Sequence, residues 1–287
     1  MIVGGYNARA TVRACLTTLT QQTAVVNAEI IFVDASTDGT ADLVAAEFPA
    51  VVLLHGNRNS LVPHLWRLGL DAARGAIIAF TIAQCIPAKD WLSQILLAHR
   101  NGPAGVGGPI DGPTNGSGLD WALYFARYSA YLSPGTPGFV DEIPGDNAAY
   151  KRIALSRCQE EMREGFWETL VHVRLRANGE KLQWSPQMSV RLGAAGNLGA
   201  TAALRFRHGR HYGATRPGGN SLLKRLARVA ASPLIVPALT ARILGRVRRQ
   251  RPDWTVHFLR ALPALIVLLN AWALGEISGY LSSRKNR

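Results

Sequence analysis

The chain has 287 residues, of which 32 are Lys or Arg and 19 are Asp or Glu, so its formal net charge is +13. A hydrophobic fraction of 48% with 18% charged residues argues against an intrinsically disordered chain. The three cysteines, Cys15, Cys85 and Cys158, have neither C-x-x-C nor metal-binding spacing. This argues against a disulfide framework and against a zinc module.

The charge is divided unevenly along the sequence. Residues 1–199 carry 16 basic and 17 acidic side chains, whereas residues 200–287 carry 16 basic side chains and two acids. About 200 residues are enough for a globular domain with its own core. We therefore predict a globular domain over residues 1–215 and a basic, apolar, helical tail over residues 216–287. The first residues lack the pattern of a secretory signal peptide, so we expect the globular domain in the cytoplasm.

Short apolar runs alternate with helical patterns over the first 110 residues. The expected strands are 2–3, 29–33, 51–54, 76–80 and 106–110, and the expected helices are 10–22, 40–48, 65–73 and 91–99. This alternation predicts parallel βαβ units and an α/β sheet with both faces covered. Ligands of such sheets bind at the carboxyl ends of the strands, where Asn7, residues 34–38 and residues 82–84 fall.

The polar loop 34–40, Asp34-Ala-Ser-Thr-Asp-Gly-Thr40, has two interpretations. It is typical of a strand end followed by a capped helix, with Thr37 or Asp38 as the cap and Gly39 in the turn. It also fits a nucleotide pocket in which Asp34 accepts hydrogen bonds from a base or a ribose. The sequence contains neither G-x-G-x-x-G after its first strand nor G-x-x-x-x-G-K-[ST], so dinucleotide and P-loop phosphate sites lack their signatures.

Residues 166–178 have a helical pattern. Apolar side chains recur along one expected stripe: Phe166, Leu170, Val173 and Ala177. Polar side chains four residues apart are expected on another face, away from the core: Glu168, His172 and Arg176. A partly buried carboxylate beside Trp167 has the chemistry of a general base. An ordinary surface Glu–His pair is the competing interpretation, and the residues alone favour it.

Four segments, taken in order, resemble the family 2 glycosyltransferases of the GT-A fold. They are Val3-Gly-Gly-Tyr-Asn7, Phe32-Val-Asp-Ala-Ser-Thr-Asp-Gly-Thr40, Gly145-Asp-Asn-Ala-Ala-Tyr-Lys-Arg152, and Glu164-Gly-Phe-Trp-Glu168 followed by Leu175 and Asn178-Gly179. The resemblance extends over most of residues 1–215. It implies a GT-A α/β domain that moves a sugar from a nucleotide sugar to an acceptor hydroxyl, with inversion at the anomeric carbon.

The resemblance also implies roles for individual residues. Donor-binding residues would be Tyr6, Asn7, Asp34, Ser36 and Asp38. The acceptor side would include Gly145, Asn147 and Trp167. Glu168 would be the general base, with Asp146 as the alternative base and His172 orienting Glu168 or binding the acceptor.

One family motif is missing. The Asp-x-Asp that binds a divalent metal such as Mg²⁺ or Mn²⁺ should follow the strand at residues 77–81, but the sequence there reads Ile82-Ala83-Gln84. A hard cation prefers carboxylates, so we assign no metal ligand and no cofactor, and a divalent metal without its usual ligands stays open as the alternative. Either the chain is a catalytically silent nucleotide-sugar- or lipid-binding module, or side-chain cations neutralise the diphosphate, which we favour.

Basic side chains gather in the segment Arg205-Phe-Arg-His-Gly-Arg-His-Tyr212. Arginine forks match phosphate oxygens in pairs, so Arg207 and Arg210, assisted by His208 or His211, are the candidate diphosphate ligands. A solvated basic helix face is the alternative interpretation. Upstream, aromatic residues recur at positions 121, 124, 125, 128 and 131, and this helical spacing favours a core over a sugar-stacking surface.

The tail combines cations with apolar stretches. Residues 222–230 have the pattern of a basic amphipathic helix, and uncharged stretches follow at 229–241 and 261–275. Both are shorter than the roughly 20 residues of a membrane span, although reading through Glu276 to residue 283 allows a single span. We favour peripheral or monotopic helices on the cytoplasmic face, and hence a lipid-linked or membrane-proximal glycan acceptor. A helical subdomain on the core or on a dimer partner stays open. Nucleic acid is disfavoured, because long apolar runs interrupt the cations.

Overall fold

In the computed structural model, the described residues are 1–22, 28–58, 60–100, 102–215, 229 and 232–282. They form two compact units. The first contains Met1–Asp111 and Tyr131–Ala194, and the second contains Gly112–Ala130 and the chain from Ala195 onward. The predicted domain boundary at residue 215 stays a prediction. By its contacts, the helix that ends at Thr215 belongs to the second unit.

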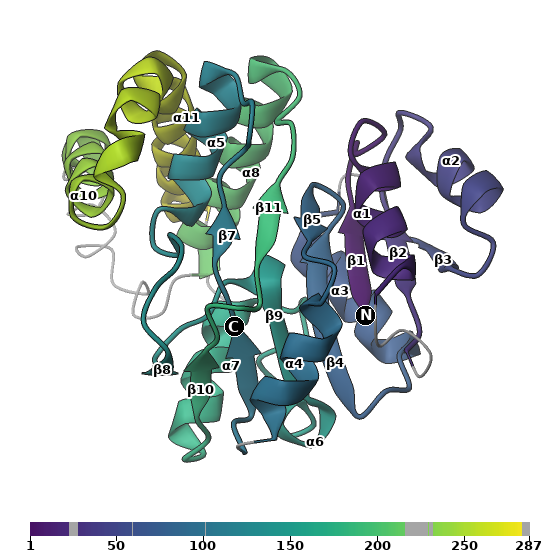
Figure 1. The fold of residues 1–287 in the computed structure, drawn as a ribbon. Coiled ribbons are helices and arrows are strands. Elements are labelled where there is room, and N and C mark those ends of the chain that lie inside the picture. The colour runs from purple at the N-terminus through teal and green to yellow at the C-terminus, as the bar shows by residue number, and fades with distance from the viewer. Residues whose placement is uncertain (23–27, 59, 101, 216–228, 230–231, 283–287) are drawn as a thin grey trace. The chain divides into compact units, whose positions relative to one another are not determined.

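The first unit is built on a mixed eight-stranded sheet with the strand order β3-β2-β1-β4-β9-β6-β10-β8 (Figure 1). Its strands are β1 (Ile2–Gly5), β2 (Ile31–Asp34), β3 (Val52–His55), β4 (Ile77–Ile82), β6 (Gly105–Gly107), β8 (Gly138–Val140), β9 (Ala148–Lys151) and β10 (Leu182–Trp184). Strands β1 to β4 pair in parallel, and β9 runs antiparallel between β4 and β6. A small second sheet joins β5 (Cys85–Pro87), β11 (Val190–Leu192) and β7 (Ile110–Asp111).

The helices of this unit follow the strands as predicted. They are α1 (Val12–Thr20), α2 (Thr40–Glu47), α3 (Val62–Ala72), α4 (Trp91–His99), the short α6 (Arg152–Leu155) and α7 (Glu168–Ala177), with a 3-10 turn η2 (Gly145–Asn147). All four residues of β1 and of β2 are buried, as expected for parallel strands covered on both faces. The α/β prediction is therefore confirmed.

One expected strand was wrong in its extent. Residues 106–110 are divided between β6 and β7, which belong to different sheets. Two adjoining residues separate these strands. Pro109 has no amide hydrogen to donate to a sheet, and a β-carbon at Gly108 would lie 1.9 Å from the carbonyl oxygen of Met188.

The second unit is helical. Its described helices are α5 (Gly118–Tyr128), α8 (Leu198–Thr215), α10 (Ile235–Gln250) and α11 (Thr255–Ser282), with short turns η3 (Ser232–Leu234) and η4 (Pro252–Trp254). The aromatic side chains of α5 are buried, which confirms them as core: Trp121, Tyr124, Phe125 and Tyr128. They contact rings from the C-terminal part of the chain, with Trp121 5.1 Å from Trp254 and Phe125 5.6 Å from Phe258 between centroids.

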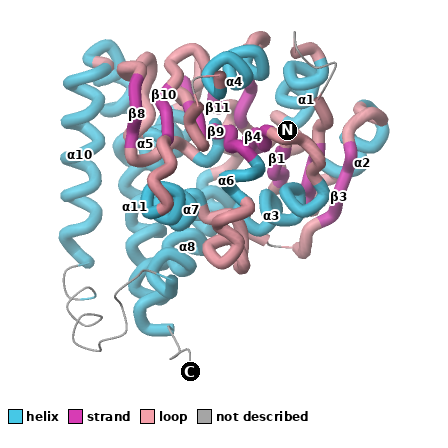
Figure 2. Tube along the Cα trace, turned by 90° about the horizontal axis from the view of Figure 1, so that it is seen from below, coloured by secondary structure: helices cyan, strands magenta, loops and turns pink. Residues whose placement is uncertain are grey.

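Helices α8 and α11 lie side by side over much of their length (Figure 2). Glycines allow this approach. A β-carbon on Gly209 of α8 would lie 2.3 Å from the carbonyl oxygen of Trp272, and one on Gly275 of α11 would lie 2.1 Å from that of Phe206. Gly213 and Gly279, one turn further along, are equally crowded. This small-x-x-x-small pattern on both helices brings the two backbones together.

Helix α11 continues through the acid that interrupts its apolar sequence. The carboxylate of Glu276 is buried, accepting hydrogen bonds from Trp272 Nε1 at 3.2 Å and from the hydroxyl of Tyr280. Among the described helices, the segment Pro252–Ser282 is long and apolar enough to cross a membrane by length and composition. The predicted amphipathic helix at 222–230 lies outside the described residues, except for Val229.

Candidate functional site

The candidate site lies where the strands of the parallel half of the sheet end. Gly5 at the end of β1 pairs with Asp34 at the end of β2, and Gly4 pairs with Ile82 at the end of β4. Because β9 is antiparallel to β4, the turn η2 that precedes it reaches the same edge. The loops after β1, β2 and β4 and the turn η2 therefore lie along one edge of the sheet.

Asn7 ties the loop after β1 to the loop after β2. Its backbone amide donates to Ser36 Oγ at 2.8 Å, and its side-chain Oδ1 accepts from the amide of Thr37 at 2.9 Å. Asn7 has a φ of +47°, a left-handed conformation that Asn tolerates better than most residues. The two loops are thus held in a fixed arrangement before any ligand arrives.

Asp34 is a buried carboxylate at the end of β2. Its oxygens accept from the amide of Ser36 at 3.1 Å and from Ser36 Oγ at 2.6 Å. Burial raises the pKa of Asp34, and the two hydrogen bonds from Ser36 oppose that rise. Two carboxylate oxygens offer about four acceptor positions, so the side chain retains acceptor capacity for a ligand hydroxyl or amide.

Asp38 and Tyr6 have structural partners in the same loops. Asp38 accepts from the amides of Arg9 and Thr40, each at 3.1 Å, so its carboxylate binds the first amide of α2, whose N-cap residue is Gly39. Gly39 turns the chain with a φ of +78°. The carbonyl of Tyr6 accepts from Gln84 Nε2 at 3.1 Å. The expected cap at Thr37 or Asp38 was therefore wrong by one or two residues, because the N-cap is Gly39. Contact of Asp38 or Tyr6 with a donor stays a prediction.

The residues at the expected metal position do not fit a hard cation. Ile82 and Ala83 have buried apolar side chains, and the amide nitrogen of Gln84 is used by the Tyr6 carbonyl. In the part of the chain that the structure describes, no group of three His, Cys, Asp or Glu side chains is arranged to hold a metal ion. Ile82, Ala83 and Gln84 therefore supply no carboxylate ligand for a divalent cation.

Glu168 lies at the edge that holds Asp34. It is the first residue of α7, where the helix dipole favours a carboxylate, and it is half-buried. A β-carbon on Gly145 of η2 would lie 3.0 Å from the Glu168 carboxyl carbon and 3.0 Å from Trp66 Cζ3. Trp66 in turn donates from Nε1 to the carbonyl of Thr81 on β4 at 2.9 Å. The predicted base and the acceptor turn are thus in contact beside the end of β4.

Trp167 is held by the start of α3. The amide of Phe166 donates to the carbonyl of Pro63 at 2.8 Å, and the rings of His64 and Trp167 meet edge to face at 5.9 Å. Trp167 is half-buried and donates from Nε1 to the carbonyl of Glu164 at 3.2 Å. These contacts fix the direction in which α7 begins, and hence the place of Glu168.

The prediction that His172 faces away from the core was wrong. His172 is fully buried, whereas Val173, predicted on the apolar stripe, is 57% exposed. The helix begins at Glu168, so Phe166 is not part of it, and a helical period counted from Phe166 selected the wrong face. The buried face of α7 is formed by Val171, His172 and Leu175.

His172 is paired with a residue that the prediction did not include. Its Nε2 lies 2.7 Å from the hydroxyl oxygen of Tyr150 on β9, and its buried Nδ1 has no hydrogen-bond partner among the described residues. Burial, then the charge of Arg176, lowers the pKa of His172 to about 3, so the ring is neutral at pH 7. Burial, then the charge of Glu168, raises the pKa of Tyr150. Tyr150 therefore pairs with His172 through its hydroxyl and is also affected by the charge of Glu168.

Asp146 and Asn147 are both buried in η2. The Asn147 side chain accepts from Trp91 Nε1 at 2.7 Å and donates to the carbonyls of Pro109 at 2.9 Å and Met188 at 2.7 Å. The side-chain amide of Asn147 therefore stabilises the turn η2 through these three hydrogen bonds. Its contact with an acceptor, and the role of Asp146 as an alternative base, stay predictions.

The predicted diphosphate ligands lie on α8, in the second unit. Arg210 is exposed there, whereas Arg207 and His208 are half-buried. Burial, followed by the charge of Arg127, lowers the pKa of His208, so the imidazole is neutral at pH 7. Asp34 and Glu168 belong to the first unit. A meeting of these α8 residues with Asp34 at one donor therefore stays a prediction.

Comparisons with known proteins agree with this architecture. The sequence model of the family described as Glycosyl transferase family 2 matches residues 1–158. None of the curated proteins compared with the chain matches it in sequence.

Three solved structures are similar to this chain. Staphylococcus aureus TarS residues 1–349 in complex with UDP-GlcNAc gives a TM-score of 0.52 at 13% identity over 94% of this chain and 90% of that one. A longer S. aureus TarS structure gives 0.51 at 13% identity, and the alignment covers 94% of this chain and 54% of that one. The mannosyltransferase PcManGT from Pyrobaculum calidifontis, in complex with GDP-Man and Mn²⁺, gives 0.49 at 18% identity over 98% and 73%. The TarS likeness confirms the predicted GT-A fold.

Proposed function

The chain belongs to glycosyl transferase family 2, and from that premise we propose that it transfers a sugar, with inversion, from a nucleotide sugar to a lipid-linked or membrane-proximal glycan. The observation that carries the proposal is the position of Glu168. Its carboxylate lies against Gly145 at the strand edge that also holds Asp34. A carboxylate beside the predicted acceptor turn, at the edge where ligands of such sheets bind, supports base-catalysed transfer.

Glu168 acts as the general base. Its carboxylate accepts the proton of the acceptor hydroxyl while the acceptor oxygen bonds to the anomeric carbon and the bond from that carbon to the diphosphate breaks. The nucleoside diphosphate leaves from the opposite face of the sugar, so the configuration inverts. We give Tyr150 a positioning role for Glu168, because the charge of Glu168 acts on its hydroxyl and that hydroxyl lies 2.7 Å from His172 Nε2.

We propose two groups of donor-binding residues. The fixed loops of Asn7 and Ser36 present Asp34 to the nucleoside, with Tyr6 and Asp38 in the same loops. Arg207, Arg210 and His208 offset the negative charge that develops on the leaving diphosphate. Preorganised arginines perform this task because their forks bind phosphate oxygens in pairs. We assign no metal to the donor diphosphate, because Ile82, Ala83 and Gln84 offer no carboxylate.

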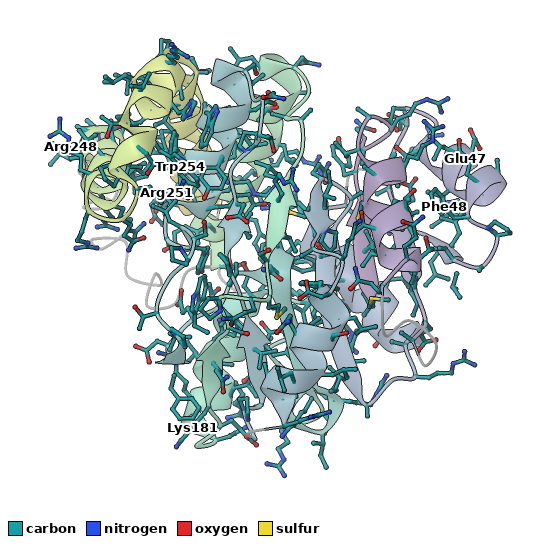
Figure 3. All side chains as sticks on the ribbon, viewed as in Figure 1. Glu47, Phe48, Lys181, Arg248, Arg251 and Trp254 are labelled. Carbon is teal, nitrogen blue, oxygen red and sulfur yellow. The ribbon has the colours of Figure 1, made fainter. Side chains whose placement is uncertain are left out.

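The second unit supports an acceptor at the cytoplasmic face of a membrane. Large apolar side chains remain exposed along α11: Val256, Leu259, Ile266, Val267, Leu274 and Leu281. The preceding helix α10 exposes Arg242, Arg248 and Arg249, and Arg251 covers the Trp254 ring at 3.6 Å (Figure 3). An apolar stripe beside arginines suits the interface of a bilayer that contains anionic lipids.

Donor binding and turnover test this function together. A thermal-shift screen of nucleotide sugars identifies the donor, because a ligand at 100 times its Kd stabilises the folded state by about 2.7 kcal/mol. Release of nucleoside diphosphate is then followed with and without EDTA. The proposal predicts turnover that EDTA does not change. Strict metal dependence would contradict the role given to the arginines.

A second candidate function is motivated by the loss of the Asp-x-Asp motif at Ile82-Ala83-Gln84. The chain would then be a catalytically silent module that binds a nucleotide sugar or a lipid. The thermal-shift screen and the turnover assay together separate the two functions. Stabilisation by a nucleotide sugar without turnover of any donor, with or without added Mn²⁺ or Mg²⁺, supports the silent module.

A further inference from the structure

Arg205 on α8 is a cation in an unusual environment. Its Nε is buried and has no hydrogen-bond partner among the described residues. Its guanidinium carbon lies 4.5 Å from the centroid of the Trp272 ring on α11. The aromatic face supports the flat guanidinium, but it accepts no in-plane hydrogen bond from Nε. A buried guanidinium donor without an acceptor is costly, so this position needs an oxygen.

Among the described residues, the charged groups that act on Arg205 do not supply that oxygen to its Nε. The ionisable groups that act on Arg205 are Arg127 and Tyr128 of α5, and those that act on the neighbouring His208 are Arg127, Arg205, Arg207 and His211. Burial, followed by the charge of Arg127, lowers the pKa of Arg205 to about 9. The carboxylate of Glu276, one turn beyond Trp272, accepts hydrogen bonds from Trp272 Nε1 and from the Tyr280 hydroxyl. Positive charge is therefore concentrated around Arg205.

We propose that Arg205, with Arg127 and His208 beside it, forms a phosphate-binding site within the second unit. A phosphate oxygen would accept from the buried Nε of Arg205, and its charge would offset both guanidinium groups. Phosphate suits this site because its several oxygens accept hydrogen bonds from more than one donor at once. The stack on Trp272 holds the guanidinium plane in place before the ligand binds.

Two ligands carry this phosphate chemistry. One is the phosphate of a membrane lipid or lipid-linked acceptor, and the other is the diphosphate of the donor. If the phosphate belongs to the donor or to a lipid-linked acceptor, this phosphate-binding site rests on the proposed function. Arg205 begins the basic segment 205–212, in which Arg207, Arg210 and His208 are the predicted diphosphate ligands, and Arg127 is about 80 residues earlier in the chain.

Binding of two soluble probes to the full chain in detergent tests the site. Inorganic pyrophosphate represents the donor diphosphate, and dihexanoyl phosphatidate represents a lipid phosphate. Isothermal titration is carried out with wild type, Arg205→Gln, Arg127→Gln and the control Arg100→Gln, which changes an exposed arginine at the end of α4. Losing a charged hydrogen bond weakens binding by about tenfold or more.

We expect at least one probe to bind to wild type and to Arg100→Gln with equal affinity. We expect the Arg205→Gln and Arg127→Gln proteins to bind the same probe about tenfold more weakly. Loss confined to pyrophosphate identifies the donor as the source of the phosphate, and loss confined to phosphatidate identifies a lipid. If Arg205→Gln does not fold, Arg127→Gln and Arg205→Lys decide the question, because Arg205→Lys retains the charge without the fork.

The site would be overturned if wild type bound neither probe, or if folded Arg205→Gln bound both probes with wild-type affinity. A Glu168→Gln protein separates this result from the proposed function. Phosphate binding that survives in Glu168→Gln while transfer is lost supports both proposals. If Arg205→Gln binds as wild type and Glu168→Gln is inactive, only the phosphate site is wrong. If Glu168→Gln is active and Arg205→Gln has lost binding, only the role of Glu168 is wrong.

Discussion

Gly145 and Glu168 are in contact across two segments of the first unit. A β-carbon on Gly145 would lie 3.0 Å from the Glu168 carboxyl carbon, closer than side chains normally approach. The absence of a side chain at Gly145 therefore determines where the carboxylate of Glu168 lies. The same β-carbon would lie 3.0 Å from Trp66 Cζ3, so a side chain at position 145 would also meet the Trp66 ring.

Gly145→Ala should displace the Glu168 carboxylate and slow transfer. A misplacement of a catalytic group by about 1 Å costs up to about a hundredfold in rate, so we expect a fall in kcat of roughly tenfold to a hundredfold. Donor affinity should be unchanged. The matched control is Gly245→Ala on α10, where an added β-carbon meets no atom within 4 Å. An unchanged kcat in Gly145→Ala would show that Glu168 is not constrained in this way.

Tyr150→Phe tests whether the Tyr150–His172 pair positions Glu168. The variant retains the ring and removes the hydroxyl that lies 2.7 Å from His172 Nε2. We expect a lower kcat, an unchanged KM for the donor and a shift of the acid limb of the pH–rate profile, because the surroundings of the base have changed. The control is Tyr212→Phe, at an exposed tyrosine of α8. A purely structural role would lower stability and leave the pH profile as it is in wild type.

The burial of His172 makes stability depend on pH. Its pKa is about 3 in the folded protein, against an ordinary value of 6.5, so between these values the unfolded chain binds more protons. The contribution is fully present above pH 6.5 and is lost as the pH falls, by at most about 1.4 kcal/mol per pH unit. Chemical denaturation of His172→Gln between pH 7 and 5 should therefore give a shallower decline than wild type. His64→Gln, at an exposed histidine, should decline as wild type does.

The glycine pairs of α8 and α11 predict a large stability effect far from Glu168. In Gly213→Leu the new side chain would start 2.3 Å from the carbonyl oxygen of Glu276. Overpacking of this kind costs about 2 kcal/mol or more. Gly199→Leu is the control, because Gly199 is exposed near the start of α8 and a β-carbon there meets only Asn197 Oδ1 at 3.6 Å. Equal melting temperatures for the two variants in detergent would contradict the close helix packing.

The strand and helix pattern of the first half could be predicted because it depends on local residue order. The alternation that placed strands near residues 31, 52 and 77 reflects burial on both faces of a parallel sheet. The polar loop after Asp34 was also predictable, since Gly39 and Asp38 act through short-range turn and capping chemistry.

Other features depend on contacts between distant residues. The buried face of α7 is set by Tyr150 on β9, and nothing in residues 166–178 reveals that partner. The grouping of α5 with α8 and α11 joins segments about 80 to 150 residues apart. The sequence did not predict Trp66 as a site residue, because its role depends on its contact with the distant Gly145.

The most direct test of the account compares Glu168→Gln with Glu164→Gln, which changes an exposed glutamate four residues earlier. Release of nucleoside diphosphate is measured for both variants and for wild type, in EDTA, with the donor and acceptor found by screening. Donor binding is measured on the same samples. We predict that Glu168→Gln binds the donor as wild type does but loses transfer by at least about a hundredfold, while Glu164→Gln retains full activity. Full turnover by Glu168→Gln would contradict the account.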